Sequence, residues 1–275
     1  MNKKNRVLVF GAHPDDGDVH CGGLALEYTA AGHKVKFVSV TNGDTGHYRI
    51  GGIELAQRRY AEAQASARIA NLEEYQILDW HNGELEPSVA NRKVIIKIIR
   101  DFKPDLIITH RPNDYHPDHR YTSQLVQDAS FIITVPNMLP LTKFISKKPV
   151  ICYMYDNFKK PYPFIPDVVV GIDKVIEKKI GMLHCHTSQM YEWLPFNDGV
   201  LDEVPEGDNA RRQWMAKRRL SGNEQITNKY RSRLIELYGE REGNRIKYAE
   251  AYEICEYGAS LSQEQIPELF PFFNK

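Results

Sequence analysis

Short apolar runs recur along the chain and alternate with longer segments that are apolar on one side only. Apolar runs of about four to eight residues, bounded by Gly, Asn, Asp or Pro, are typical of buried strands. Runs of this kind predict strands over 6–12, 34–40, 75–80, 105–110, 150–155 and 167–172. Apolar positions three or four residues apart are typical of amphipathic helices, and they predict helices over 19–31, 53–70, 88–102 and 173–192.

This alternation of strands and helices predicts an α/β fold: a Rossmann-like parallel sheet with helices on both faces. Right-handed crossovers would place the loops that follow the strands along one edge, so an active site is expected at the carboxyl ends of the strands. Residues 5–192 carry the alternating pattern, whereas 195–275 are charged and mostly helical in character. We therefore expect a single domain over 1–275, with a helical C-terminal extension packed on its core.

The composition narrows the classes of partner. Lys plus Arg and Asp plus Glu both number 36, so the formal net charge is zero and provides no overall field for nucleic acid. The four cysteines form no Cys-x-x-Cys pair, which argues against a thiolate metal site or a disulfide scaffold. No apolar stretch approaches the roughly 20 residues needed to cross a bilayer. The expectation is a cytoplasmic protein with a small-molecule partner and no membrane span; a homo-oligomer stays open.

The exit of the first predicted strand concentrates polar side chains in the sequence AHPDDGD. His13 and Asp16 are three residues apart, and an imidazole with a carboxylate suits zinc. Asp15 between them would reach a metal-bound water instead. The structural alternative is that Asp15 and Asp16 merely cap the helix that follows. Nucleotide binding is disfavoured, because the loop lacks G-x-G-x-x-G and its acids would repel a pyrophosphate.

The exit of the strand at 105–110 has the same character, in the sequence THRPNDYHPDHR. It carries three histidines and two acids, which are His110, His116, His119, Asp114 and Asp118. Two strand exits at one edge of a parallel sheet can meet, so one histidine from this loop would complete a site with the ligands of the first loop. Three protein ligands leave one position open for water, which is typical of catalytic rather than structural zinc. A lone histidine, by contrast, is more often an ordinary surface or core residue.

The two loops resemble the PIG-L / LmbE-like family of zinc-dependent N-acetylglucosaminyl deacetylases. The resemblance rests on AHPDD at 12–16 and HPDH at 116–119, and it extends over about residues 5–190. Weaker matches follow in order: TNGDTG at 41–46, Arg59 with Glu62, and His186, Ser188 and Gln189. Gly17 stands where the family usually has Glu, and Asp114 stands where some members have Tyr.

The resemblance implies a metal site and a base. His13, Asp16 and His119 would bind the metal, expected to be Zn²⁺, with Fe²⁺ or another divalent metal as an alternative. Asp15 would be the general base on metal-bound water. The implied reaction is hydrolysis of the acetamide of an N-acetylglucosamine-type sugar conjugate.

The resemblance also implies roles on the substrate side. His116 would stabilise the oxyanion or protonate the leaving amine, and Asp118 would orient a nearby imidazole. Arg59 would face the sugar, and Asp114 would contribute to substrate binding at the rim.

Two other classes of function stay open from the residues alone. A metal-dependent amidase or esterase that acts on a non-sugar substrate would use the same loops. A non-catalytic carbohydrate-binding module would not need Asp15. Among the weaker signals, the aromatic stretch 152–164 fits a sugar-stacking wall or, better, a strand with a rim loop. The basic run 211–219 fits phosphate binding or, better, a solvated helix face.

Overall fold

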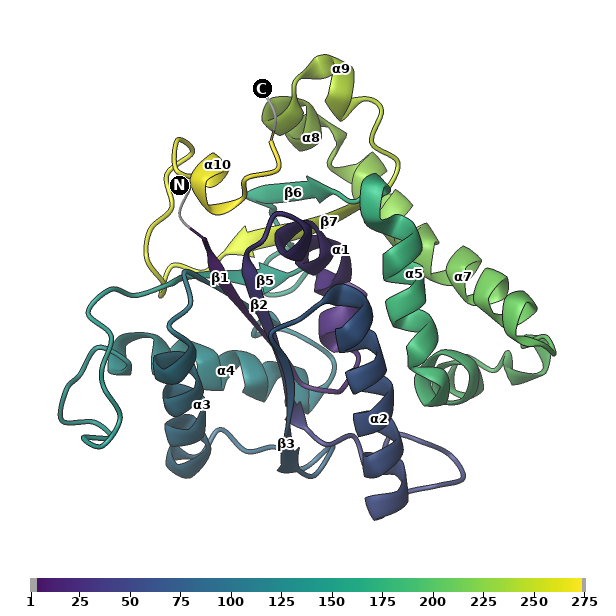
Figure 1. The fold of residues 1–275 in the computed structure, drawn as a ribbon, viewed down its shortest axis with the longest axis horizontal. Helices are drawn as coiled ribbons and strands as arrows, with labels where there is room; N and C mark the ends of the chain where they lie inside the picture. The colour runs from purple at the N-terminus through teal and green to yellow at the C-terminus, as the bar shows by residue number, and fades with distance from the viewer. Residues whose placement is uncertain (1–3, 274–275) are drawn as a thin grey trace.

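The computed structural model describes residues 4–273. Within them, seven strands form one sheet in the order β3-β2-β1-β4-β5-β7-β6 (Figure 1). The strands are β1 Arg6–Gly11, β2 Lys34–Thr41, β3 Glu74–Trp80, β4 Leu106–Thr109, β5 Val150–Met154, β6 Val168–Gly171 and β7 Ala249–Ile254. The first five pair in parallel, as the alternation of strands and helices predicts.

The helices that flank the sheet are α1 Asp16–Ala30, α2 Gly52–Ala70, α3 Val89–Phe102, α4 Pro117–Ile132 and α5 Ile176–Cys185. The later part of the chain adds α6 Leu194–Asn197, α7 Asp208–Lys229, α8 Arg231–Tyr238, α9 Glu240–Gly243 and α10 Ile266–Leu269. A π-helical segment, Ser188–Trp193, joins α5 to α6, so the expected single helix over 173–192 is interrupted. No helix among residues 4–273 has the length and apolar character to cross a membrane.

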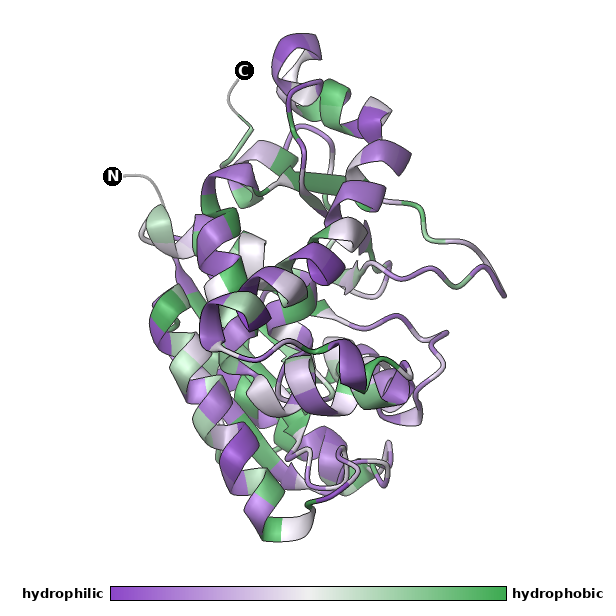
Figure 2. Cartoon of the chain, turned by 90° about the vertical axis from the view of Figure 1, so that its right-hand side faces the viewer, coloured by the Kyte–Doolittle hydropathy of each residue, from purple (hydrophilic) through white to green (hydrophobic). Residues whose placement is uncertain are grey.

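The two faces of the sheet are covered by different helices, and alternate residues of β1 show this. Val7 and Val9 pack in the hydrophobic cluster that contains α1 and α2 residues, whereas Leu8 and Phe10 pack with α3 and α4 residues. Side chains alternate between the faces of a strand, so a strand buried on both faces is apolar throughout. Figure 1 shows the same separation, and Figure 2 shows largely hydrophobic strands behind helices of mixed character.

The C-terminal part of the chain differs from the expected helical extension, because it also supplies β7. This strand pairs antiparallel with both β5 and β6 and therefore lies inside the sheet. Its sequence, AEAYEI, contains two alanines and two glutamates, which have no strong preference for strands. Pairing with its two neighbours, rather than local sequence, makes this segment a strand.

The order of the strands places a topological switch point between β1 and β4. The chain leaves β1 toward α1 on one face of the sheet and leaves β4 toward α4 on the other face. Such a topological switch point separates two neighbouring loops and is where open α/β sheets bind their ligands. The two loops rich in histidine and aspartate are the ones that flank this point.

Candidate metal and catalytic site

The switch point brings the polar residues of the two loops together at the carboxyl ends of β1 and β4. His13 and Asp15 lie in the β1–α1 connection, and Asp16 begins α1. On the other side, α4 begins at Pro117, a favoured residue for the first helical turn. His116 is therefore the N-cap of α4, and His119 lies in the first turn of a helix rather than in the expected loop.

Three side chains converge with the geometry of a metal site. His13 Nδ1 lies 3.2 Å from His119 Nε2 and 3.5 Å from Asp16 Oδ2, and His119 Nε2 lies 3.6 Å from Asp16 Oδ2. In a tetrahedral zinc site with bonds of about 2.05 Å, neighbouring ligand atoms are about 3.4 Å apart. The donor atoms of these three residues therefore fit a divalent metal, and they are the three that the family resemblance implies as ligands, an assignment that stays a prediction.

Two further carboxylates hold the outer nitrogens of the two imidazoles. Asp118 Oδ2 lies 3.1 Å from His13 Nε2, and Asp114 Oδ2 lies 3.1 Å from His119 Nδ1. A carboxylate in this position fixes the orientation of a metal-binding histidine and makes it a stronger ligand. Asp118 is thus placed to orient an imidazole, and the half-buried Asp114 contacts His119.

The charges of the site favour a cation. Burial lowers the pKa of His13, but its contacts with Asp118 and Asp16 outweigh this and raise the pKa to about 9. Burial raises the pKa of Asp16, but His119 and His110 hold it well below its usual value. The carboxylates that stabilise a protonated imidazole here would equally stabilise a bound metal ion.

His110 is a further histidine of the site, to which the sequence assigns no role. Its Nε2 lies 3.1 Å from Asp16 Oδ2, and its ring stacks on that of His119 at 4.0 Å between centroids. The ring nitrogen also accepts a hydrogen bond from the backbone N–H of Ala12. Asp16, His110 and His119 form a second group that could hold a metal, and His13, His116 and His119 form a third.

His116 is less buried than the metal-site histidines and faces them with its ring. Its centroid is 4.6 Å from that of His13, and its Nδ1 accepts a hydrogen bond from the backbone N–H of Asp118. Burial and the neighbouring His13 and His119 lower the pKa of His116 to about 4. The ring is therefore neutral at pH 7 and, with Nδ1 accepting, carries its proton on Nε2.

Asp15 is held by Arg59 in a buried ion pair. Arg59 Nη2 donates to Asp15 Oδ1 at 3.0 Å, and Nη1 donates to the carbonyl oxygen of Gly43. Only 2% of the Arg59 residue is exposed, and a Cβ at Gly43 would lie 2.4 Å from Nη1. The expected contact of Arg59 with a sugar is not supported by this geometry, since its guanidinium is turned to Asp15.

The loop after β3 also reaches the site, which the sequence does not signal. Asp118 accepts hydrogen bonds from the backbone N–H groups of Gly83 at 2.6 Å and Leu85 at 3.3 Å. Gly83 has a φ of +87°, a conformation that favours glycine. The sequence NG at 82–83 marks a turn, but nothing in it indicates that the turn holds Asp118.

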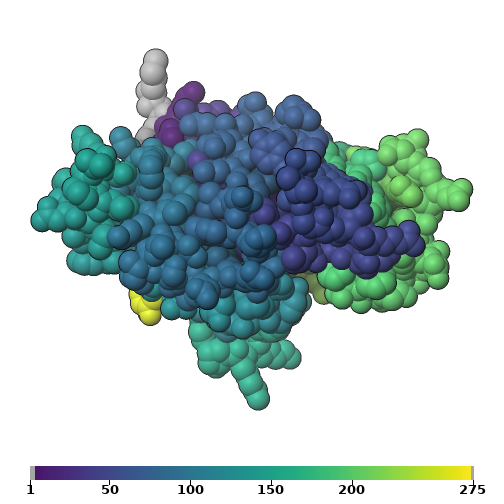
Figure 3. All heavy atoms as spheres, turned by 90° about the horizontal axis from the view of Figure 1, so that it is seen from below, coloured from purple at the N-terminus to yellow at the C-terminus, as the bar shows by residue number. Residues whose placement is uncertain are grey.

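The weaker matches to the family form contacts that support the site; these residues are Glu62, His186, Ser188 and Gln189. Glu62 accepts hydrogen bonds from the backbone N–H and the hydroxyl of Ser188, and Gln189 donates to the carbonyl oxygen of Gly46. His186 Nε2 lies 3.2 Å from Asp18 Oδ2, with both side chains fully buried. These contacts join the π-helical segment to α1, α2 and the loop after β2. Figure 3 views the molecule from the edge where these loops lie; a segment near residue 160 projects from it.

Comparison with known proteins finds a match to a family model in the part of the chain that carries both loops. The model of the PIG-L family, described as GlcNAc-PI de-N-acetylase, matches residues 8–130. Diacetylchitobiose deacetylase of Thermococcus kodakarensis is 29% identical over 71% of this chain and 76% of its own length. A probable N-acetyl-α-D-glucosaminyl L-malate deacetylase of Bacillus cereus is 26% identical over 77% and 94%.

This chain is also similar to proteins that are named for a different activity, the addition of water to a substrate. The 4-oxalmesaconate hydratase of Pseudomonas putida is 26% identical over 68% of this chain and 75% of its own length. Two solved structures share the fold. N,N'-diacetylchitobiose deacetylase of Pyrococcus horikoshii has a TM-score of 0.70 at 23% identity, covering 92% of this chain and 84% of its own. A 4-carboxy-2-hydroxymuconate hydratase of Pseudomonas putida has a TM-score of 0.73 at 18% identity, covering 94% and 98%.

Proposed function

We propose that the protein is a metal-dependent N-deacetylase, because the model of the PIG-L family matches residues 8–130. Its substrate would be an N-acetylglucosamine-type sugar conjugate, from which it releases acetate. The observation that carries the proposal is the convergence of His13, Asp16 and His119 within 3.6 Å of one another, next to a fixed Asp15. Similarity to deacetylases of N-acetylglucosamine compounds supports the choice of reaction.

His13, Asp16 and His119 hold the metal in this proposal, with Asp118 and Asp114 behind the two imidazoles. A divalent metal bound there would polarise the acetyl carbonyl and make a nearby water more acidic at neutral pH. The protein fixes the ligands through two helix N-termini that the β-sheet brings together. Zinc is the metal that this set of nitrogen and oxygen donors favours in our proposal.

Asp15 is the general base that takes a proton from the attacking water. Arg59 binds Asp15 Oδ1 and keeps the carboxylate oriented. The second carboxylate oxygen, Oδ2, can then accept the proton. Arg59 is thus a positioning residue for the base rather than a sugar ligand.

His116 stabilises the oxyanion that forms when water attacks the acetyl carbon. Its pKa of about 4 makes the ring neutral at pH 7, so it acts as a hydrogen-bond donor through Nε2–H rather than as a cation. The hydrogen bond from the backbone of Asp118 to Nδ1 fixes the tautomer that this role needs. A positive metal nearby would lower this pKa further and keep the same tautomer.

The proposal is tested by mass spectrometry of a panel of N-acetylhexosamine conjugates incubated with metal-loaded protein. We expect loss of one acetyl group from at least one conjugate. Asp15→Asn should retain the metal and lose about 100- to 10,000-fold in rate, because an amide cannot accept the proton. Asp202→Asn changes an exposed aspartate and is the matched control.

Two results would contradict these assignments. If no hexosamine loses acetate but a non-sugar amide or ester is cleaved, the protein is the amidase or esterase that the sequence leaves open. If Asp15→Asn loses its metal while Asp16→Asn retains it, the roles of the two aspartates are exchanged.

A second candidate function is the addition of water to a carbon–carbon double bond. It is favoured by the similarity to 4-oxalmesaconate hydratase over 68% of the chain. The same assay separates the two reactions, since hydration raises the substrate mass by one water and releases no acetate. A hydrated product from an unsaturated carboxylic acid, with no deacetylation, would favour this second candidate.

The expectations of a cytoplasmic location and of no nucleic-acid partner stay predictions, and a homo-oligomer stays open. We propose that the chain is one domain over 1–275, because β7 from the C-terminal part lies between β5 and β6.

A further inference from the structure

The two residues that were expected to contact the sugar are both engaged with other side chains of the site. Arg59 belongs to a buried ion pair, and the Asp114 carboxylate lies 3.1 Å from His119 Nδ1. A large aromatic residue next to them is instead open to solvent, since 72% of Tyr115 is exposed. Its ring centroid lies 5.7 Å from that of His116 and 5.8 Å from that of His119. An exposed ring therefore stands directly beside the proposed oxyanion donor and a proposed metal ligand.

Hydrogen bonds hold the backbone that carries Tyr115. Arg120 Nη1, from α4, donates to the carbonyl oxygen of Asp114 at 2.6 Å and to that of Tyr115 at 3.0 Å. Asp114 Oδ1 accepts a hydrogen bond from the backbone N–H of His116 at 2.9 Å. A tyrosine on a fixed backbone has only two side-chain torsions left to order when a ligand binds. It can therefore offer a large contact area at a low cost in conformational entropy.

A second aromatic residue, Phe158, packs beside Tyr115 from the segment that follows β5. The two ring centroids are 6.2 Å apart, with an angle of 38°. This segment projects from the edge where the site lies (Figure 3), and the buried Arg111 holds it there. Arg111 donates to the carbonyl oxygens of Phe158 at 3.3 Å and of Tyr162 at 2.9 Å. The β4–α4 loop, which carries the histidines of the site, therefore also fixes the position of Phe158.

Three other aromatic residues of the same stretch pack inward. Tyr153 and Phe164 are buried, and the ring of Tyr155 packs on that of Phe164 at 5.2 Å between centroids. For these residues, the interpretation as a strand with a rim loop describes the stretch. Phe158 differs from them, because it packs against the exposed ring of Tyr115 at the site.

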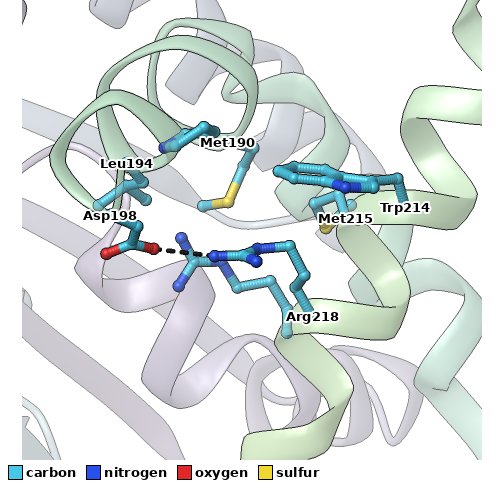
Figure 4. A pocket seen from close by; sticks show the side chains of 8 residues that line it. Met190, Leu194, Asp198, Trp214, Met215 and Arg218 are labelled. Atoms are coloured by element: carbon cyan, nitrogen blue, oxygen red, sulfur yellow. Dashed lines mark hydrogen bonds and ion pairs between the residues drawn. The ribbon is translucent and has the colours of Figure 1, made fainter. Parts of the chain in front are cut away.

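The opposite side of the site, after β2, has aromatic rings that stack on one another. Tyr48 stacks on Phe196 of α6 at 4.2 Å between centroids, with an angle of 9°. The neighbouring pocket between α6 and α7, shown in Figure 4, is lined by apolar side chains such as Met190 and by the ion pair of Arg218 with Asp198. Its free volume of about 10 Å³ holds roughly one water. A sugar ring cannot enter this pocket, whereas the ring of Tyr115 is open to one.

We propose that Tyr115 stacks on the sugar ring that carries the acetamide, with Phe158 holding the Tyr115 ring in position. A pyranose ring with equatorial substituents presents axial C–H groups on its faces, and removing these from water against an aromatic ring is favourable. The inference rests on the proposed function and deepens it, because it makes the apolar face of the pyranose a condition for good substrates. Tyr115 is then a specificity-determining residue, and Phe158 is a positioning residue.

The test compares a ring-shaped with an open-chain substrate. Methyl N-acetylglucosaminide contains a pyranose ring, whereas N-acetylglucosaminitol carries the same acetamide on a chain of hydroxyl groups with no ring. Tyr115→Ala should lower the ratio of kcat/KM for the first to that for the second by about 10-fold, mainly through KM. Tyr115→Phe keeps the aromatic face and should keep the ratio.

Two further variants test the arrangement of the rings. Phe158→Ala should lower the same ratio, but by less than Tyr115→Ala, because the Tyr115 ring remains and loses only its neighbour. Phe131→Ala is the matched control: it removes a ring that is 68% exposed near the other end of α4 and should leave the ratio unchanged.

A readout without turnover uses the deacetylated product, methyl glucosaminide. Saturation-transfer NMR detects magnetisation that passes from aromatic protons of the protein to sugar protons in contact with them. Wild type and Tyr115→Phe should show strong transfer to the axial C–H protons, and Tyr115→Ala should lose most of it. The calorimetric Kd of the same product should rise about 10-fold in Tyr115→Ala and stay constant in Phe131→Ala.

The outcomes separate this inference from the proposed function. If both substrates lose acetate with a ratio that Tyr115→Ala does not change, the stacking contact is rejected and the deacetylase stands. If neither loses acetate but methyl glucosaminide binds in a manner that depends on Tyr115, the contact stands and the deacetylase is rejected. An equal loss on both substrates, with a lowered melting temperature, or no binding of the product to wild type would overturn the inference.

Discussion

Individual residues of the site owe their roles to the atoms they meet rather than to their type. Asp15, Asp16, Asp114 and Asp118 are four aspartates in two short loops. Asp16 Oδ2 points to three histidines, whereas Asp15 is bound by an arginine. Asp114 and Asp118 each contact the outer nitrogen of one imidazole. In the proposed mechanism, an aspartate would therefore serve as a metal ligand, as a base or as the support of a ligand, according to its contacts.

The first prediction at this scale separates the proposed ligand set from the alternative group that contains His110. His13→Ala, Asp16→Ala and His119→Ala should each lower the metal content, because each removes one of three donors. His110→Ala should retain most of the metal, since His110 belongs only to the alternative group with Asp16 and His119. Metal analysis of the purified variants is the measurement. Loss of metal from His110→Ala together with full occupancy in His13→Ala would place the ion in the alternative group.

The second prediction concerns Arg59, whose contact with Asp15 replaces the expected contact with a sugar. Arg59→Ala should lower kcat by about 100-fold for a sugar amide and for a small acetamide alike, because a misplaced base affects both. KM for the sugar substrate should change little. Steady-state kinetics with both substrates is the measurement. A rise in KM confined to the sugar would restore Arg59 as a substrate-binding residue.

At the scale of helices and strands, the site depends on how α1 and α2 are joined to the segment after α5. Asp18, in the first turn of α1, contacts Ser66 of α2, Tyr75 of β3 and His186 at the end of α5. All four of these side chains are buried. A charged group in this setting is stable only with several partners, so the cluster fixes the relative positions of these elements.

The third prediction uses the pH dependence of this cluster. Burial lowers the pKa of His186, but Asp18 raises it above 6.5 overall. A histidine with a raised pKa in the folded state stabilises the protein fully below its unfolded pKa of about 6.5, and this stability is lost as pH rises through the folded pKa. The difference in unfolding free energy between wild type and His186→Gln should therefore shrink above pH 6.5. Urea denaturation of the metal-loaded proteins at several pH values measures it, and a difference that does not depend on pH would contradict a charged His186.

Across the whole molecule, residues far apart in the sequence complete the core. Glu250 of β7 is fully buried and accepts hydrogen bonds from the backbone N–H groups of Gly23 and Leu24, each at 2.8 Å. It also pairs with the buried Lys179 of α5 at 2.6 Å. Gly23 allows this approach, because a Cβ there would lie 2.9 Å from Glu250 Oε1 and 2.5 Å from Ile172. The N-terminal helix, the middle of the chain and the C-terminal strand thus meet at one carboxylate.

The fourth prediction concerns the buried ion pair between Glu250 and Lys179. Glu250→Gln should lower the unfolding free energy by about 3–5 kcal/mol, because it leaves the charge of Lys179 buried without its partner. The exposed Glu256→Gln is the control and should have little effect. The double variant Lys179→Met with Glu250→Gln should be more stable than Glu250→Gln alone. Denaturation curves check the series, and a change below 1 kcal/mol in Glu250→Gln would show that the pair adds no stability.

The sequence by itself determines the strand–helix order and the two loops that carry the chemistry. Apolar runs such as Val7–Phe10 must be buried on both faces, which requires helices on each side of the sheet. His13 follows one predicted strand closely, the segment that contains His119 follows another, and parallel strands place their carboxyl ends at one edge. These inferences depend on local pattern and on rules of connection that hold for any α/β protein, so they need no knowledge of particular contacts.

Tertiary structure alone decides which partner each polar residue meets. The segment 249–254 is a strand because it pairs antiparallel with β5 on one side and with β6 on the other. Arg59 binds Asp15 instead of an open surface because the loop at Gly43 closes over it. Charges act over distance in space rather than along the chain, so their roles follow from the packed fold and not from the order of residues.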